Sequence, residues 1–473
     1  MNLTAGSAEF EAEMRQRLIR NSGLMTEGPI AKQLLIYAIP ILLSSFLQQL
    51  YNIVDTMVAG KLINYNALAA VGANGVIVSL LVGFFLGFTT GGSVIISQAF
   101  GARDTKGVFD GVHTAVGVSI AAGVLLTGLG LVFTPALLKL INTPEEVRGM
   151  AIQYLTIYFC GTVPVMLYNM GSAILRAVGN STLPLVFLAV AAGMNTVLDF
   201  VFVGGLKMGI AGTAWATVIS QTLAAALTVA ALMRTEGIYK LFIRKIRIKK
   251  DVLFQILKLG VPAGLQTSVI SLSNILIQRA INGFGAVVMA GAAVAGKVDG
   301  IVGGTIASFG LATTGFSGQN YGAGRIDRVK KGARIGFLMS FSACIIMSGI
   351  LLIFRNQVAS LFNEDPQVIK SAVQMMVMML PLYWVYGIVD IFGGTMRGAG
   401  STFVPMVVIL VGMCLMRMVW IAVAAPVFSD VRAVFAVYPI SWIWTAIPMW
   451  LIYLRGKWNK KGEGVISCET SSS

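Results

Sequence analysis

The chain has 473 residues, of which 56% are hydrophobic and 12% are charged, and its formal net charge is +15. Soluble domains carry about 25% charged residues, so this composition excludes a soluble enzyme, a disordered chain and a secreted disulfide scaffold. Since one membrane helix needs about 20 apolar residues, the chain has room for roughly a dozen membrane spans.

Uncharged runs along the chain predict twelve membrane helices. Their expected ranges are 33–54, 68–92, 112–136, 150–172, 183–204, 209–232, 254–278, 285–313, 333–354, 370–394, 403–425 and 433–454. We therefore expect an all-α integral membrane protein in five parts. These parts are a polar, helical N-terminal lead-in (1–32), an N-lobe of six helices (33–233), a basic linker (234–253), a C-lobe of six helices (254–455) and a polar tail (456–473).

The distribution of basic residues predicts how the chain crosses the membrane. With twelve spans both termini lie on one side, which carries 24 of the 35 Lys and Arg residues, against 7 in the opposite loops. Loops rich in Lys and Arg stay in the cytoplasm, so we expect a multi-pass protein of the cell membrane with both termini and the linker in the cytoplasm. This bias accounts for the net charge, so no nucleic-acid partner is expected, and nothing in the sequence demands more than a monomer.

The two halves of the chain repeat each other. The AIPILL segment around Pro40 recurs 222 residues later as GVPAGL, and SQAFGARD (97–104) resembles GQNYGAGR (318–325) at an offset of 221. LRAVGNSTLP (175–184) resembles MRGAGSTFVP (396–405), again at an offset of 221. Six helices per repeat give both halves the same orientation. We therefore expect two pseudo-symmetric six-helix bundles, the layout of transporters that bind substrate between two rocking bundles.

Ionisable residues inside a membrane are costly, so each needs a partner or a function. Four acids lie in the predicted spans or directly at their ends, and they are Asp55, Asp199, Asp299 and Asp390. The Lys and Arg residues outside the loops of either side all belong to the second half and are Lys258, Arg279, Lys297 and Arg417. Asp55 and Asp199 therefore have no cation in their own half, so they must hold protons or bind a cation from solution.

The neighbours of these two acids favour a cation site. Gln48, Tyr51 and Asp55 recur at steps of three and four, which places them on one helix face. Asn195 precedes Asp199 by four residues and shares its face. Carboxylate and amide oxygens suit Na⁺, and two close carboxylates equally suit a proton. A structural alternative stays open, in which Asp55 caps a kink while Asn195 and Asp199 bond neighbouring helices.

The other polar residues have competing interpretations. Lys297 and Asp299 either line the cavity or form structural pairs. Asp390 follows Asn169 by 221 residues, at the equivalent position of the second half, and is a secondary candidate. His113, the single histidine, is expected to be a structural residue at a helix end.

Chemistry other than transport has little support in the sequence. The cysteines, at positions 160, 344, 414 and 468, show no metal or disulfide spacing. No nucleophile–base pair, HExxH motif or phosphate-binding loop occurs in the chain. We therefore expect no enzyme activity, no cofactor, and no metal beyond Na⁺ at the coupling site.

Four segments carry a resemblance to a known family. They are LQQLYNIVDTMVAG (47–60), ISQAFGARD (96–104), LRAVGNST (175–182) and MNTVLDFVFVGGLKMGIAGTAWATVISQ (194–221). With them the chain resembles the multidrug and toxic compound extrusion (MATE) family over essentially all twelve spans. The resemblance implies two six-helix lobes around a central cavity. It also implies export of small amphipathic, often cationic compounds in exchange for inward H⁺ or Na⁺.

Within that family the chain looks closer to the DinF-like branch, whose cation site lies in the N-lobe. By motif match this site would consist of Asp55, Asn195, Asp199 and Thr217. The residues that match cavity-lining positions of the same branch are Gln48, Tyr51 and Asn169. The NorM-like branch has a key glutamate in the seventh helix, where this chain reads LQTSVISLSNIL (265–276) without an acid.

The predicted mechanism is cation-coupled antiport. A proton or Na⁺ neutralises Asp55 and Asp199, and the first helix repacks at Pro40, where the missing N–H permits a bend. Two alternatives share the fold and differ in cargo. One is a flippase for lipid-linked oligosaccharides, which would need a cationic cavity, and the other is a dedicated metabolite exporter.

Overall fold

The computed structural model describes residues 24–140, 143–427, 430–456 and 458. Across these residues the regular secondary structure is helical, without strands. In this part of the chain eleven helices are long and apolar enough to cross a membrane, and one bent helix pair makes up a twelfth span. The predicted all-α fold with twelve membrane spans is confirmed.

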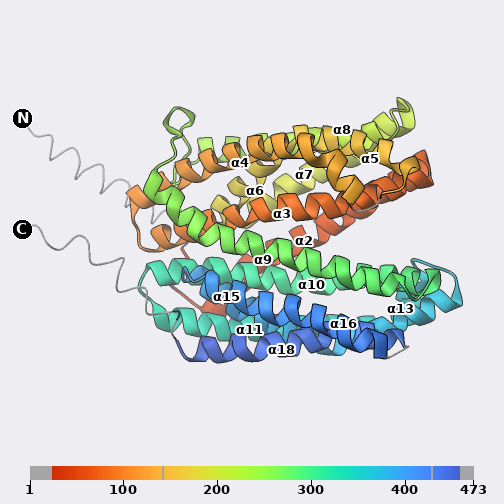
Figure 1. Ribbon diagram of the computed structural model, residues 1–473. Coiled ribbons are helices and arrows are strands. Elements are labelled where there is room, and N and C mark those ends of the chain that lie inside the picture. Colours follow the sequence, from red (N-terminus) through yellow and green to blue (C-terminus); the bar gives the residue numbers. More distant parts are fainter. Residues whose placement is uncertain (1–23, 141–142, 428–429, 457, 459–473) are drawn as a thin grey trace, which may run out of the picture.

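The first half of the chain forms one bundle, the upper one in Figure 1. Its helices are α2 (Ile30–Val58), α3 (Tyr65–Gly101), α4 (Thr105–Leu140), α5 (Glu145–Cys160), α6 (Thr162–Ala177), α7 (Thr182–Asp199) and α8 (Ile210–Arg234). Two π-helical segments, η1 (Ala59–Ile63) and η2 (Phe200–Gly205), extend α2 and α7. Asn64 starts α3 by accepting the N–H of Ala67 at 2.8 Å, which satisfies a backbone donor that the first helical turn leaves free.

The second half begins with a short 3₁₀ turn, η3 (Ile243–Lys245), and forms the lower bundle in Figure 1. Its longer helices are α9 (Lys250–Asn282), α10 (Ala286–Gly322), α11 (Ile326–Ile353), α13 (Pro366–Met379), α14 (Tyr383–Gly398), α16 (Met416–Val427) and α18 (Val437–Leu454). Shorter elements connect or continue them, namely α12 (Arg355–Ser360), η4 (Leu380–Leu382), α15 (Phe403–Ile409), η5 (Leu410–Leu415) and α17 (Val431–Phe435).

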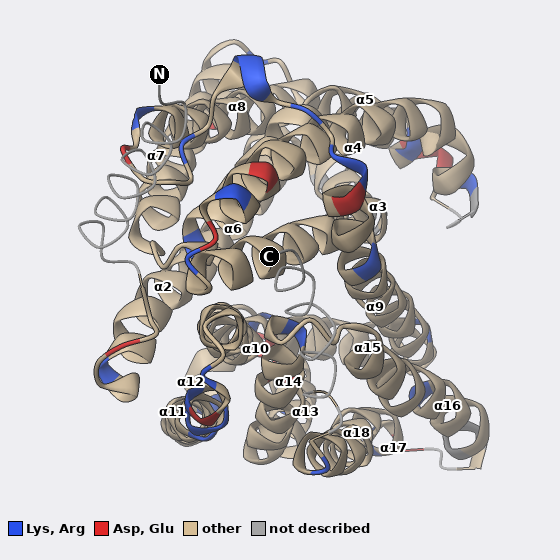
Figure 2. Ribbon diagram, turned by 90° about the vertical axis from the view of Figure 1, so that its left-hand side faces the viewer, with Lys and Arg blue, Asp and Glu red and all other residues tan. Residues whose placement is uncertain are grey.

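The first helices of each half pack against the other half. α9 runs between the bundles along α3, and α10 packs against both α2 and α3. Figure 2 views the molecule from the end where α2 begins and α18 finishes, which we call the terminal end, and shows α3 beside α9 and α2 beside α10. The opposite end is called the far end below.

One predicted helix differs from the observed structure in its path through the bundle. The prediction of a single helix over 150–172 is wrong, because the chain bends by 53° between α5 and α6. The bend lies at Gly161, where a Cβ atom would sit 2.6 Å from a methyl of Val218 on α8, so close approach of the two helices requires glycine. A hydropathy pattern records length and apolarity and does not report such a bend.

At the terminal end, α3 and α10 extend nine residues beyond their predicted limits and cross each other. A Cβ on Gly101 would lie 1.9 Å from the carbonyl oxygen of Gln319, and a Cβ on Gly322 would lie 1.9 Å from that of Gln98. The side chains repeat the exchange, since Gln98 Nε2 donates to Gly398 O at 2.7 Å and Gln319 Nε2 donates to Ala177 O at 2.9 Å. These contacts are related by the 221-residue repeat and close the terminal end.

The segment 24–29 crosses this closed end as an extended strap. Met25 N–H donates to Gln319 Oε1 at 2.8 Å, and Arg325 NH1 donates to Thr26 O at 2.6 Å. Glu27 pairs with Arg103 of the first half at 3.3 Å and with Arg325 of the second half at 3.9 Å. The strap therefore contacts both bundles. Of the predicted helical lead-in (1–32), residues 1–23 lie outside the described part, and 24–29 are not helical.

The linker between the halves is held by the first bundle. His113 Nδ1 bonds to Phe109 O at 2.7 Å, so this nitrogen carries the proton, and Nε2 accepts the N–H of Phe242 at 3.1 Å. Asp110 forms an ion pair with Lys249 immediately before α9. His113 thus anchors the linker, a contact that its position in the sequence did not reveal. Of the predicted tail (456–473), only 456 and 458 are described.

Candidate cation site

Three helices of the first bundle bring four predicted site residues together. Asp55 lies one turn before the end of α2, Asn195 and Asp199 occupy the last turns of α7, and Thr217 lies on α8. α7 packs against both α2 and α8. Asn195 and Asp199 are fully buried, and Thr217 is 5% exposed.

The side chains of these residues face one another. The carboxyl group of Asp55 lies beside those of Asp199, Asn195 and Thr217. The Tyr51 hydroxyl lies one turn away on α2, beside Thr217. Thr217 Oγ1 donates to the Thr213 carbonyl at 3.0 Å, which leaves its lone pairs turned toward the cluster. The geometry assembles carboxylate, amide and hydroxyl oxygens, which are the groups that coordinate a hard cation.

Most polar atoms of this cluster have no partner within the described part of the chain. The buried atoms without a hydrogen bond are Tyr51 Oη, Asp55 Oδ1, both amide atoms of Asn195 and both carboxylate oxygens of Asp199. Each such buried group costs about 1–3 kcal/mol, and more when it is charged. The structural alternative requires Asn195 and Asp199 to bond neighbouring helices; their side chains lie beside the Asp55 carboxyl group of α2, but the unprotonated groups form no hydrogen bond that meets normal geometry with the described residues. An external proton or cation would satisfy the oxygen atoms of this set.

Asn169 and Gln48, the other residues predicted to line the cavity, are not part of this cluster of unpaired atoms. Asn169 Nδ2 donates to Val165 O of its own helix at 2.8 Å. Gln48 is half-buried on the face of α2 that carries Tyr51. The neighbouring face of α2 contacts α10, where Ser45 Oγ hydrogen-bonds Ser308 Oγ at 2.9 Å. α2 therefore lies between the candidate cation site and the second bundle, and Pro40 lies two turns before Gln48 on the same helix.

The two predicted site acids of the second bundle have partners. The Tyr383 hydroxyl donates to Asp299 Oδ1, and Arg397 NH2 pairs with Asp390 Oδ1 at 3.2 Å. Lys297 is exposed on α10 and forms no ion pair with the described residues, so it is not bonded to Asp299. The Asp390–Arg397 pair could have been found in the sequence, because a spacing of seven residues places both on one face of α14.

Arg417 is a buried cation whose hydrogen-bond partners the sequence did not reveal. Arg417 is 4% exposed, and its Nε donates to Ser441 Oγ while NH1 donates to Asn274 Oδ1, both at 3.0 Å. Its guanidinium carbon lies 5.1 Å from the centre of the Tyr438 ring. Arg417 thereby joins η5–α16, α18 and α9 near a cleft between α3 and α9.

The internal repeat is matched twice by one family model. The MatE model covers residues 40–201 and again residues 262–423, so the two matches begin 222 residues apart. Together they account for more than half of the chain.

Relatives with known names match over most of their length. The probable multidrug resistance protein YpnP of Bacillus subtilis is 30% identical over 92% of this chain and 97% of its own. The probable multidrug resistance protein YoeA of the same organism is 30% identical over 79% of this chain and 82% of its own. The probable multidrug resistance protein NorM of Thermotoga maritima is 24% identical over 95% of this chain and 97% of its own.

Solved structures share the fold. An outward-facing multidrug resistance MATE family transporter superposes with a TM-score of 0.87 at 20% identity, over 94% of this chain and 99% of that one. A transporter of the MOP superfamily from Pyrococcus furiosus gives a TM-score of 0.85 at 21% identity, over 92% of this chain and 97% of that one. With the doubled family match, the relatives and the fold in agreement, the chain belongs to the MatE family of multidrug and toxic compound extrusion transporters.

Proposed function

We propose that this membrane transporter exports small amphipathic, often cationic, organic compounds in exchange for inward H⁺ or Na⁺. The proposal is carried by one observation, the cluster of buried polar atoms around Asp55 and Asp199 that lack hydrogen-bond partners among the described residues. Two carboxylates in a membrane bundle without a nearby cation are stable only when they hold a proton or a bound cation. The proposed function requires a coupling ion, H⁺ or Na⁺, and no cofactor.

The proposed orientation puts the terminal end, with both termini, in the cytoplasm of a cell-membrane protein, as its excess of Lys and Arg indicates. The crossing of α3 and α10 then closes the cytoplasmic side, and the cleft between α3 and α9 opens to the outside. In this orientation the described state is ready to release cargo and to receive the coupling ion.

The proposed cycle couples the ion to a movement of α2. An incoming H⁺ or Na⁺ neutralises Asp55 and Asp199 and allows α2 to pack more closely against α7. The shift bends α2 at Pro40 and narrows the proposed cargo cavity between the lobes, where Gln48 is a predicted lining residue, and cargo is expelled. Exchange is driven because the ion binds the two conformations with different affinity. A monomer of two rocking lobes, 33–233 and 254–455, is sufficient for this cycle.

The same contacts favour a coupling site in the first bundle, as in the DinF-like branch. Asp299 and Asp390 are held by Tyr383 and Arg397, whereas Asp55 and Asp199 have no such partner. A paired carboxylate has less free energy to gain from an external cation than an unpaired one. A coupling site in the second bundle therefore has less support.

Efflux of a cationic dye tests the proposed function. Cells that express the protein are expected to extrude preloaded ethidium faster than cells with an empty vector. Collapse of the proton gradient by an ionophore should stop the efflux if H⁺ is the coupling ion, and removal of Na⁺ should stop it if Na⁺ is. Equal efflux from both kinds of cell, for ethidium and for other amphipathic cations, would count against drug export and favour a dedicated metabolite or a lipid-linked oligosaccharide as cargo.

Pro40→Ala is expected to slow ethidium export while leaving the folded protein intact. Proline in a helix interior removes one backbone hydrogen bond and costs about 3 kcal/mol, so alanine restores the bond and resists bending of α2. The melting temperature should stay equal or rise, and the efflux rate should fall. An efflux rate equal to that of the wild type would show that α2 does not bend at Pro40 during transport.

A further inference from the structure

We propose that the cleft between α3 and α9 binds an anionic group, a carboxylate or a phosphate carried by an amphipathic molecule. The inference rests on the proposed export function, because it assigns a class of cargo to the same transporter. It extends that class from cations to molecules with a negative charge. It is based on the cleft wall, which presents hydrogen-bond donors and a positive charge, whereas the cation site presents oxygen acceptors and acids.

The cleft lies at the far end, where α3 begins and α9 ends, and has a volume of about 590 Å³. Binding sites for drug-sized ligands have volumes of about 300–1,000 Å³. The α3 wall includes Gly72 and Gly75, and a Cβ atom on either would have no neighbour within 4 Å. The cleft is therefore large enough for an organic molecule, and its α3 wall is open backbone rather than packed side chains.

The opposite wall presents hydrogen-bond donors. Arg417 has only N–H groups and cannot accept, so the Asn274 oxygen must face its guanidinium, and the Asn274 NH₂ group remains free at the cleft. In the same way Gln278 donates to Asn282 Oδ1 at 2.8 Å, which leaves the Asn282 NH₂ group unused. Two amide donors of α9 are thus available to a ligand, and the orientation of the first is set by a buried arginine.

Arg279 adds a positive charge to this wall. It lines the cleft and has no ion pair or hydrogen bond among the described residues. Arg279 is exposed in the last turn of α9, so its guanidinium is accessible to a ligand in the cleft. None of the described residues that line the cleft is acidic, and the two acids within the spans of the second bundle, Asp299 and Asp390, are bonded to Tyr383 and Arg397. Arg279 is therefore free to pair with a negative group of a ligand.

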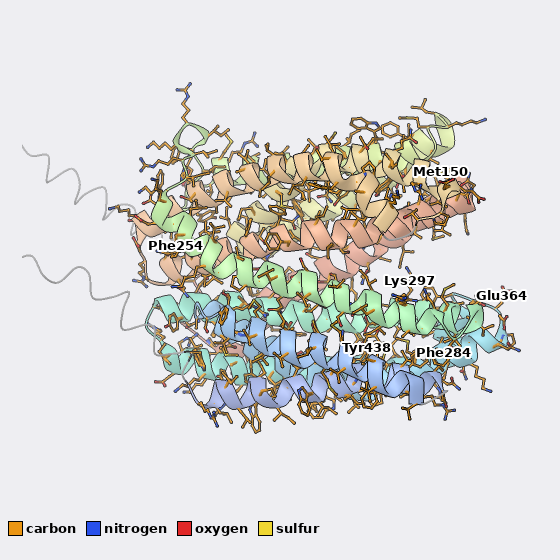
Figure 3. The ribbon with its side chains drawn as sticks, in the orientation of Figure 1. Met150, Phe254, Phe284, Lys297, Glu364 and Tyr438 are labelled. Carbon is orange, nitrogen blue, oxygen red and sulfur yellow. The ribbon has the colours of Figure 1, made fainter. Side chains whose placement is uncertain are left out.

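The second bundle has a second unpaired cation, Lys297. Lys297 on α10 is exposed and lies between the two bundles (Figure 3). The unpaired acids of the candidate cation site, Asp55 and Asp199, thus belong to the first bundle, and the unpaired cations Arg279 and Lys297 belong to the second. Guanidinium groups bind carboxylate and phosphate through two parallel hydrogen bonds, and Arg279 and the Asn274 amide, which both line the cleft, supply donors for either group.

Direct binding to the purified protein tests this site without any ion gradient. The soluble probe is carboxyfluorescein, and the lipid probe is phosphatidylglycerol with a fluorescent tail, compared with the same lipid bearing a phosphatidylcholine head. Arg279→Gln should raise the Kd of the bound anionic probe by about tenfold or more, the loss of one hydrogen bond between charged groups. Arg279→Lys should bind with an affinity between those of the wild type and Arg279→Gln, because it keeps the charge and loses the two parallel hydrogen bonds. Lys258→Gln is the matched control, because Lys258 is exposed on the same helix and lies outside the cleft.

Each outcome has a clear reading. A weaker affinity for carboxyfluorescein in Arg279→Gln identifies a dissolved organic anion, and a weaker affinity for phosphatidylglycerol alone identifies a lipid head group. The proposal is wrong if the wild type binds neither probe, or if Arg279→Gln binds as the wild type does or weakens no more than Lys258→Gln. Failure of the wild type to export ethidium would count against the proposed export function, whereas this binding measurement stands apart from it.

Discussion

Asp199→Asn and Asp55→Asn are each expected to reduce ethidium export to the level of cells without the protein, while the variant still folds and reaches the membrane. Asparagine has nearly the size of aspartate but no charge, so the cluster around α2 and α7 no longer attracts H⁺ or Na⁺. Export against a gradient then loses its driving force, although the cavity remains. The measurement is dye efflux at matched membrane abundance of each variant.

The control for these variants is Asp251→Asn. Asp251 is an exposed acid in the first turn of α9, so its replacement makes the same chemical change away from the cluster and should leave efflux unchanged. Wild-type efflux in both Asp55→Asn and Asp199→Asn would contradict the proposed coupling site.

Ion binding gives a second readout of the same site. A ligand that binds only the folded state stabilises that state by about 2.7 kcal/mol when its concentration is 100 times its Kd. If Na⁺ is the coupling ion, it should raise the melting temperature of the wild type and not that of Asp199→Asn, with K⁺ as the control salt. If the wild type shows no response to Na⁺, and acidification weakens binding of ethidium by the wild type but not by Asp199→Asn, H⁺ is the coupling ion.

Gly101→Ala and Gly322→Ala are expected to abolish export by keeping the terminal end from closing. In each case the new Cβ would lie 1.9 Å from a backbone carbonyl oxygen of the other bundle, so α3 and α10 must separate. Folding should survive, because the largest apolar cluster lies within the second half and another lies within the first. The matched control is Gly349→Ala on α11, where a Cβ meets nothing within 4 Å.

The separation can be measured directly between spin labels at exposed positions beside the crossing. Lys106 begins α4 and Lys330 lies in the first turns of α11, so cysteine at both positions reports the distance between the bundles at the terminal end. The mean distance should increase in Gly322→Ala and stay at the wild-type value in Gly349→Ala. An unchanged distance together with wild-type efflux would show that the close crossing is not needed for transport.

Hydropathy and repetition in the sequence predicted most of the architecture. The twelve predicted ranges all fall on observed helices, because an apolar run of about 20 residues has few stable arrangements other than a membrane helix. The 221-residue repeat predicted two bundles in one orientation. The bend at Gly161 was missed, since it depends on contact with Val218 of α8, and so was the extension of α3 and α10, since their polar last turns are held by one another.

The charge distribution in the sequence predicted the candidate cation site, because Asp55 and Asp199 have no cation in the spans of their own half. Spacing placed Tyr51 with Asp55 and Asn195 with Asp199 on shared faces, because helical periodicity acts over three to four residues. The same periodicity could have paired Asp390 with Arg397. It could not pair Asp299 with Tyr383, which lies 84 residues away, or Arg417 with Asn274, which lies 143 residues away.

The sequence by itself determined the helices, their number, the repeat and the excess of acids without cations in the first half, because these follow from local composition and periodicity. Only the tertiary structure decided which polar groups find partners. It satisfies Asp299, Asp390 and Arg417, leaves the atoms around Asp199 unpaired and leaves Arg279 at an open cleft. The physical reason is that a hydrogen bond needs its two atoms within about 3 Å, and helix packing sets that distance between residues far apart in the chain.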